Sequence, residues 1–347
     1  MIKTYLIFFL SYMLTFLLTY FGVERFRRWS LRRKLFDIPN ERSSHTQPTP
    51  RGGGLIIAAV CLSIFFVYCL IFGQIESLWA YFVGAGIVVF ISWLDDLFTV
   101  SVAWRFSAHS LAASLVIWSL GFWENVYLPF AGEIIFGKIG VLITFLWIVW
   151  LINAYNFMDG IDGIAGTQAV TAGIGWLLIG ILLNAQNTAF YGIVIALSSL
   201  AFLLHNWQPA KIFMGDAGSA FLGYTFAVMP LLAFRETPQI SKNLLPLIAV
   251  MLVLAFIFDS LWTLAKRILR FEKIWLAHRE HIYQKLVIGG LSHQFVTILY
   301  LLVSSITVGL LILWLKIRRN SGDFLYLIIF FQLFCLLAYS FKKKTLT

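Results

Sequence analysis

Short polar motifs interrupt a sequence that is otherwise strongly apolar, and the densest of them covers residues 153–166. Asn153, Asn156 and Asp159 recur every third residue, so they share one side of a helix. Asp162 follows three residues later, and each of these two aspartates precedes a glycine. Carboxylate and amide oxygens at this spacing suit Mg²⁺, which prefers one or two carboxylates together with substrate phosphates and water. A helix cap followed by a turn would explain one Asp-Gly pair but not the whole array.

Two further motifs supply acids at the ends of apolar runs. Asp95 and Asp96 are adjacent, and like charges raise each other's pKa unless a cation lies between them. A divalent metal or a basic substrate group is a natural partner for this pair, and a solvated helix end is the alternative. Asp216 lies in Phe-Met-Gly-Asp-Ala-Gly-Ser, immediately before an apolar run. Because a helix N-terminus attracts phosphate, Asp216 either caps the helix or holds a metal whose other ligands are phosphates.

Two more motifs carry groups that bind anions. His278, Arg279 and His281 fit the phosphates of a nucleotide diphosphate better than zinc, because no cysteine or third nearby histidine completes a zinc site. An amphipathic interfacial helix is the alternative here. The loop 37–54 begins with an acid and ends in Pro-Arg-Gly-Gly-Gly, a candidate anion site or a turn with a positive membrane anchor.

The composition shows which kind of protein must position these motifs. The chain has 347 residues, of which 60% are hydrophobic and only 12% are charged. A soluble domain carries about 25% charged residues, so a soluble globule, a disordered chain and a soluble nucleic-acid binder are excluded. The net charge of +10 comes from cations that flank apolar runs, which indicates topology rather than nucleic-acid binding. We therefore expect an all-α, polytopic bundle in a lipid bilayer, formed by one domain over residues 1–347.

Charge-free intervals predict the spanning helices, because a span needs roughly 20 mostly apolar residues. The interval 163–210 is long enough for two helices and is broken at 184–187. The count is about eleven, over 4–23, 52–75, 77–94, 106–123, 139–158, two within 163–210, 217–234, 243–265, 286–315 and 324–341.

Orientation follows from the basic residues. Segment 24–51 holds eight Lys and Arg, which predicts that it is cytoplasmic and that the N-terminus lies outside. Alternation then makes the C-terminus cytoplasmic and places every polar segment on the cytoplasmic side; these segments are 37–54, 95–104, 153–166, 205–219 and 266–293. Asp259 lies roughly 10 Å inside its helix and should face the protein rather than lipid.

The ordered motifs resemble those of the polyprenyl-phosphate N-acetylhexosamine-1-phosphate transferases. This family includes the enzymes that initiate O-antigen, the teichoic-acid linkage enzyme and the phospho-MurNAc-pentapeptide transferase of peptidoglycan synthesis. The resemblance covers residues of about 37–286. It implies a bacterial inner-membrane enzyme with a cytoplasmic active site, which uses Mg²⁺ (or Mn²⁺) to transfer a sugar 1-phosphate from a UDP-N-acetylhexosamine to polyprenyl phosphate, with UMP released.

The resemblance also implies roles for the motif residues. Asp216 would hold the metal with Asp159, while Asp95 and Asp96 would position or deprotonate the lipid phosphate. Asp162 would join the other aspartates as a catalytic residue. His278, Arg279 and His281 would grip the nucleotide diphosphate. The other expected binding residues of the site are Asp37, which matches the acid of the family's first cytoplasmic loop, and Arg51, Asn153 and Asn156 from the motifs above.

Two departures from the family pattern bear on the branch. Thr99 stands where a lysine often follows the acidic pair, and the motif His-Arg-Glu-His replaces the run of histidines of the peptidoglycan enzyme. The second departure favours the branch that initiates O-antigen, with the peptidoglycan enzyme as the alternative. A cation-coupled transporter is disfavoured, because the sequence has no internal repeat and its acids lie at helix ends on one face. The identity of the sugar and a homodimer remain open.

Overall fold

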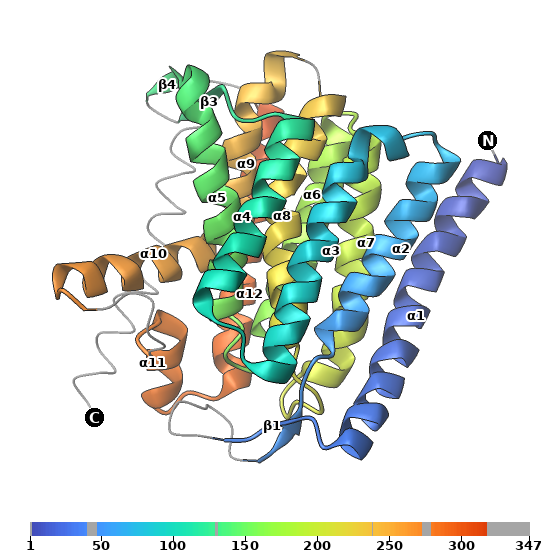
Figure 1. Ribbon diagram of the computed structural model, residues 1–347. Coiled ribbons are helices and arrows are strands. Elements are labelled where there is room, and N and C mark those ends of the chain that lie inside the picture. The colour runs from blue at the N-terminus through green and yellow to red at the C-terminus, as the bar shows by residue number, and fades with distance from the viewer. Residues whose placement is uncertain (1, 40–46, 129–130, 238, 273–278, 318–347) are drawn as a thin grey trace.

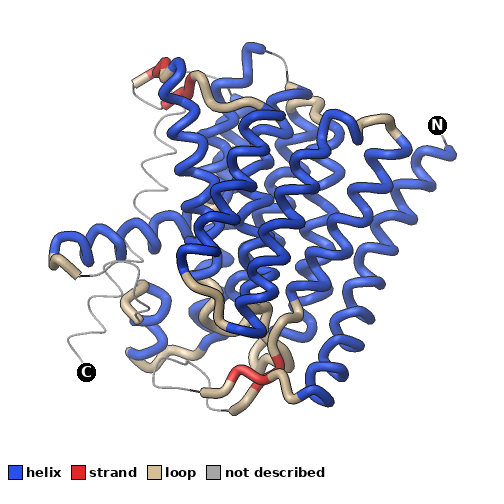
Figure 2. Tube along the Cα trace, in the orientation of Figure 1, coloured by secondary structure: helices blue, strands red, loops and turns tan. Residues whose placement is uncertain are grey.

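The computed structural model describes residues 2–39, 47–128, 131–237, 239–272 and 279–317, and these residues form a bundle of long helices (Figures 1 and 2). The helices are α1 (Ile2–Arg33), α2 (Gly54–Ile71), α3 (Ile75–Phe98), α4 (Val102–Leu120), α5 (Gly140–Phe157), α6 (Ile164–Leu182), α7 (Gln186–Asn206), α8 (Asp216–Glu236), α9 (Leu245–Leu252), α10 (Leu254–Leu269), α11 (Ile282–Ile288) and α12 (His293–Ile317). Two antiparallel strand pairs are β1 (Phe36–Asp37) with β2 (Thr49–Pro50), and β3 (Asn125–Leu128) with β4 (Gly132–Ile135).

Among the described residues, eight helices are long and apolar enough to cross a membrane, or nine if the bent pair α9–α10 counts as one span. The expectation of an all-α membrane bundle is therefore confirmed, whereas the count of about eleven is not. The predicted span 106–123 forms α4, which packs against α3 and α5 but is too polar to be counted, with Arg105, His109 and several serines. The predicted span 324–341 lies outside the described residues.

The apolar stretch 243–265 forms two helices rather than the single predicted one. The chain bends by 73° between α9 and α10, and α10 runs sideways out from the edge of the bundle (Figure 1). The physical reason is the polar side of α10, where Asp259, Ser260, Thr263 and Arg267 are buried against the protein. A sideways course keeps these groups among protein partners, because lipid could not satisfy them.

Helix α8 is the centre of the bundle, and almost all of its residues are buried. It packs against α2, α3 and α5, whereas most of the span in α1 remains open to its surroundings. Gly54 of α2 and Gly218 of α8 face each other so closely that a Cβ atom on either would overlap the other's backbone. This contact brings the beginnings of two helices together at one end of the bundle.

The loops that carry the polar motifs all lie at that end. The β1–β2 pair precedes α2 there, while the N-terminus lies at the opposite end (Figure 1). The predicted gathering of the polar segments on one side of the bundle is therefore confirmed for the described residues.

Two glycines of α3 give a matched test of this packing. A Cβ atom at Gly84 would overlap the hydroxyl of Tyr224 in α8, whereas a Cβ atom at Gly86 meets nothing within 4 Å. We expect Gly84→Ala to lower the stability of the detergent-solubilised protein by about 1–3 kcal/mol through overpacking. Gly86→Ala should leave the thermal unfolding midpoint unchanged or slightly higher, since alanine is the better helix former. Equal midpoints for the two variants would contradict the α3–α8 contact.

Candidate active site

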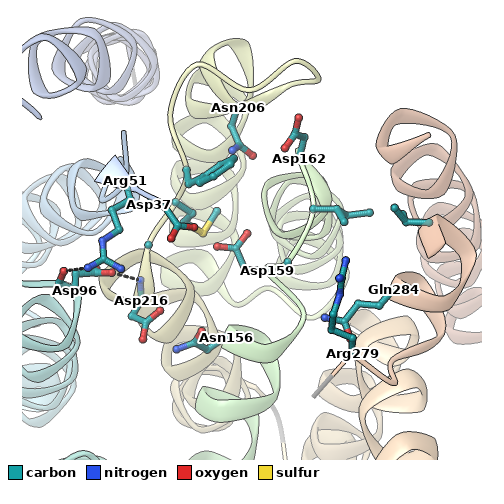
Figure 3. A pocket seen from close by; sticks show the side chains of 16 residues that line it. Asp37, Arg51, Asp96, Asn156, Asp159, Asp162, Asn206, Asp216, Arg279 and Gln284 are labelled. Atoms are coloured by element: carbon teal, nitrogen blue, oxygen red, sulfur yellow. Dashed lines mark hydrogen bonds between the residues drawn. The ribbon is translucent and has the colours of Figure 1, made fainter. Parts of the chain in front are cut away.

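A pocket of about 260 Å³ opens where the motif loops meet (Figure 3). Its wall includes residues from the first loop, from α3, from the α5–α6 and α7–α8 connections, and from the segment that leads into α11. Five aspartates line it: Asp37, Asp96, Asp159, Asp162 and Asp216. The predicted convergence of acids that are far apart in the sequence is confirmed for these five.

The α5–α6 connection positions the central acids of the pocket. Helix α5 ends at Phe157, and the next residues turn so that Asp159 and Asp162 both line the cavity. Asp162 also fixes the neighbouring loop, because its carboxylate accepts a hydrogen bond from the backbone amide of Ala210 at 3.1 Å. Asn156 lines the pocket beside Asp216, whereas the Asn153 amide donates to the carbonyl of Val149 at 2.7 Å and is not part of the wall.

The beginning of α8 is held by an acid from another helix. The Asp96 carboxylate in α3 accepts the backbone N–H groups of Asp216 at 3.1 Å and of Ala217 at 3.2 Å. These are amides that a helix cannot satisfy internally, so Asp96 caps α8. Gly215 has a φ of +77°, and a Cβ atom there would lie 2.9 Å from the Asp96 carboxylate. The two motifs are thus parts of one structural unit, and the predicted role of Asp96 at the lipid phosphate stays a prediction.

The Pro-Arg-Gly-Gly-Gly run is fastened to the loop that precedes α8. Phe213 donates to the carbonyl of Pro50 at 2.8 Å, and Gly54 donates to that of Met214 at 2.8 Å. Gly52 adopts a φ of +97°, which a side chain would disfavour. The result is that Arg51 lines the pocket and its guanidinium donates to the backbone carbonyl of Asp96.

Asp95 lies just outside the pocket wall and is paired with Arg105. The two side chains are 2.6 Å apart, and the Asp95 carboxylate also accepts the Val100 amide at 2.6 Å. The same guanidinium is 3.8 Å from the Asp216 carboxylate. Sequence reasoning expected a metal or a substrate group beside this acidic pair and did not assign Arg105. The sequence feature that could have identified Arg105 is its position ten residues after Asp95, on the next helix.

The histidine motif divides into residues that reach the pocket and residues that do not. His278 lies outside the described residues, and Arg279 lines the pocket as expected. His281 is not part of the wall: it is only 4% exposed, and its Nδ1 lies 3.0 Å from the carboxylate of Asp259. The expectation that Asp259 faces the protein is confirmed, since it is fully buried.

Two residues of the pocket wall were missed entirely by the sequence analysis. Gln284 lines the pocket three residues after His281. Asn206 ends α7 and connects two loops, because its side chain accepts the Gly163 amide at 3.0 Å and donates to the Ile212 carbonyl at 2.9 Å. Both residues lie within segments that the sequence analysis had already recognised as polar. A single Asn or Gln side chain in such a segment has no spacing pattern that would mark it as a site residue.

The electrostatics of the pocket favour a bound cation. Burial, reinforced by the nearby carboxylates of Asp216, Asp96 and Asp162, raises the pKa of Asp159 well above its usual range. A cation among these oxygens would relieve the repulsion and favour the ionised form. Within the described part of the chain, no three acidic, histidine or cysteine side chains are arranged to hold a metal by themselves. The donor set therefore fits Mg²⁺ completed by phosphate oxygens and water better than a metal held by protein alone.

Comparison with known proteins decides the family. The profile of glycosyl transferase family 4 matches residues 78–234, which include Asp95, Asp159 and Asp216. A probable undecaprenyl-phosphate N-acetylglucosaminyl 1-phosphate transferase of Bacillus subtilis is 30% identical over 297 residues, 81% of this chain and 79% of that protein. This chain belongs to glycosyl transferase family 4. The resemblance inferred from the motifs is thereby confirmed.

Other family members have similar names. A decaprenyl-phosphate N-acetylglucosaminephosphotransferase of Mycolicibacterium smegmatis is 31% identical to this chain. The aligned region covers 84% of this chain and 79% of that protein. An undecaprenyl-phosphate alpha-N-acetylglucosaminyl 1-phosphate transferase of Haemophilus influenzae is also 31% identical, over 80% of this chain and 79% of that protein. The matches extend well beyond the profile and take in most of the bundle.

The capping of α8 by Asp96 leads to a test of stability. We expect Asp96→Ala to lower the free energy of unfolding by about 1–3 kcal/mol, because one buried and one partly buried amide lose their acceptor. Unfolding of the purified protein by SDS titration measures this change. Glu76→Ala is the matched control, since Glu76 is an exposed acid in the first turn of the same helix, far from the pocket. An equal effect of both substitutions would contradict the capping role.

Proposed function

We propose that this protein transfers N-acetylglucosamine 1-phosphate from UDP-N-acetylglucosamine to polyprenyl phosphate. A phosphate oxygen of the lipid attacks the β-phosphorus, the bond to the leaving phosphate breaks, and the products are polyprenyl diphospho-N-acetylglucosamine and UMP. The observation that carries the proposal is the convergence of five aspartates, with arginines beside them, at one end of an apolar bundle. The names of the relatives support this sugar and this class of acceptor.

We place the enzyme in the bacterial inner membrane with the pocket facing the cytosol, where nucleotide sugars are made. The described part of the basic segment, from Arg25 to Lys34, follows the spanning part of α1 at the pocket end of the bundle, as the positive-inside rule requires. The expectation that the product initiates an O-antigen chain stays a prediction, as does a homodimer. The relatives' names favour this transfer over the peptidoglycan reaction and over a transporter.

In this proposal Asp216 and Asp159 hold Mg²⁺, with Asn156 beside them. Mn²⁺ is the alternative ion. When bound, the metal neutralises charge on the diphosphate and on the leaving UMP, which lowers the barrier for one anion to attack another. The capping of α8 by Asp96 holds the Asp216 backbone against α3, and Asp216 and Asp159 line the same pocket.

The walls of the pocket suggest where each substrate binds. Arg279 and Gln284 lie across the cavity from Asp96 and Asp216 (Figure 3), and we assign them to the nucleotide diphosphate. Their donors match phosphate and carbonyl oxygens. The lipid phosphate then approaches from the side of the acidic pair. Its second pKa is roughly 6, so it is already largely dianionic near neutral pH and needs no strong base.

The transfer reaction provides the direct test. Purified protein in detergent, incubated with radiolabelled UDP-N-acetylglucosamine, polyprenyl phosphate and Mg²⁺, should produce labelled lipid and UMP. Asp216→Asn should lower the rate by about 100-fold or more, because it removes a charge that acts on the reacting phosphates. Glu76→Gln is the matched change of an exposed carboxylate at the other end of the bundle and should leave the rate unchanged. Full activity of Asp216→Asn would overturn the metal role.

The raised pKa of Asp159 predicts a proton coupled to the metal. In protein freed of metal with EDTA, burial and its neighbours keep Asp159 protonated at pH values where an ordinary carboxyl is ionised. Mg²⁺ binding should therefore release a proton and become tighter as the pH rises towards the raised pKa.

Calorimetric titration with Mg²⁺ in buffers of different ionisation enthalpy measures the released proton. The apparent heat should depend on the buffer for the unmodified protein and for Glu76→Gln, and much less for Asp159→Asn. A heat that is the same in every buffer for the unmodified protein would refute the coupling.

A further inference from the structure

The carboxylate of Asp259 lies outside the pocket wall, yet it is among the most completely bonded groups of the described chain. It is fully buried in α10. It accepts the backbone amides of Ile282 at 2.8 Å and Tyr283 at 3.0 Å, and the hydroxyl of Tyr300 at 2.6 Å. It also pairs with His281 Nδ1 at 3.0 Å. The Thr263 hydroxyl, one turn further along α10, also donates to it at 3.3 Å. A buried acid is costly unless it is paired and hydrogen-bonded, so five partners on one carboxylate point to a specific task.

The partners of Asp259 define the beginning of α11. Ile282 and Tyr283 are its first two residues, whose amides have no acceptor within their own helix. Asp259 supplies that acceptor from a different helix. The side chain of Gln284 turns back to accept the amide of His281 at 3.3 Å, so the first turn of α11 is fixed at both backbone and side chain. The direction in which Gln284 enters the pocket therefore depends on Asp259.

A second contact joins this turn to the acids. The Tyr283 hydroxyl donates to the carbonyl of Phe157 at 3.0 Å. It lies against Gly160, where a Cβ atom would overlap it. The anchored turn of α11 thus packs directly on the connection that carries Asp159. Displacement of the turn would move one wall of the pocket relative to the other.

Arg279 is followed directly by two anchored residues. Glu280 pairs with Arg267 of α10 at 3.0 Å, and His281 pairs with Asp259. Arg267 is itself largely buried and also pairs with Glu272 at 3.0 Å. Helix α10 therefore holds the two residues that directly follow Arg279, and the Arg279 side chain lines the pocket next to this held segment.

We propose that Asp259 is a positioning residue for the nucleotide sugar. It holds the segment 279–284 so that Arg279 and Gln284 face the aspartates across the pocket, and His281 acts through this anchor rather than by contact with the substrate. The assignment to the nucleotide sugar rests on the proposed transfer reaction; the anchoring of the turn does not. The helix that carries this anchor is the one that follows the 73° bend after α9.

Hydrogen exchange tests the anchor without any assumption about the reaction. Asp259→Asn replaces one accepting oxygen by a donor and should make the amides of Ile282 and Tyr283 exchange about tenfold faster or more. Peptides from α6 and α8 should be unaffected. Ser260→Ala, a buried change at the next position of α10, is the matched control and should leave residues 279–288 protected. If Asp259→Asn does not fold, Tyr300→Phe removes one partner and should produce a smaller change in the same direction. Unchanged exchange in residues 279–288 would overturn the anchor.

Steady-state kinetics test the consequence for binding. Asp259→Asn should raise the KM for UDP-N-acetylglucosamine by about tenfold, the effect of one or two lost hydrogen bonds, and leave the KM for polyprenyl phosphate unchanged. In a background that carries both Arg279→Ala and Gln284→Ala the same substitution should have little further effect, because Asp259 acts through these two side chains. Equal changes in both KM values, or fully additive effects, would refute the positioning role. If the unmodified protein transfers no sugar phosphate, the proposed function fails, while hydrogen exchange still decides the anchor.

Discussion

Mutual repulsion between carboxylates is the constraint on which the arrangement of this bundle depends. Five aspartates line one small pocket, and such a cluster is stable only if each charge is neutralised or hydrogen-bonded. The protein supplies hydrogen-bond partners to these five carboxylates to different extents. Asp96 accepts two amides of α8, and Asp162 accepts an amide of the loop before α8. Burial and the neighbouring carboxylates, of which Asp216 is one, raise the pKa of Asp159, so a cation beside Asp159 and Asp216 is favoured where the substrate phosphates are proposed to bind.

The glycines of the motifs follow from the same constraint. Backbone amides can reach a buried carboxylate only where chains approach closely. Gly215 leaves room for the Asp96 side chain, and the facing pair Gly54 and Gly218 lets α2 and α8 begin side by side. Gly160 leaves room for Tyr283 in the same way. These residues carry no chemical group, yet they determine how near the acids lie to their partners and to one another.

The sequence predicted the parts of the structure that depend on composition along one segment. Charge-free runs located the long helices, and the acids at their ends indicated a shared pocket. Contacts between distant segments were not accessible in this way. Arg105 was not assigned to the site from the sequence, because its approach to Asp95 and Asp216 depends on how α4 packs. The anchoring of α11 by Asp259 depends on a bend that apolar composition does not encode.

The acids of these motifs are alike in sequence but perform different tasks. Asp96 and Asp259 each cap a helix that belongs to another part of the chain, so their lone pairs are largely occupied by protein. Asp159 and Asp216 line the cavity and are the acids that we propose as metal ligands. The structural acids hold α8 on one wall and α11 on the other, and the distance between these walls limits what the pocket can bind. Counting the acids in the sequence motifs therefore gives too many candidate catalytic residues, because some of these acids serve to hold helices in place.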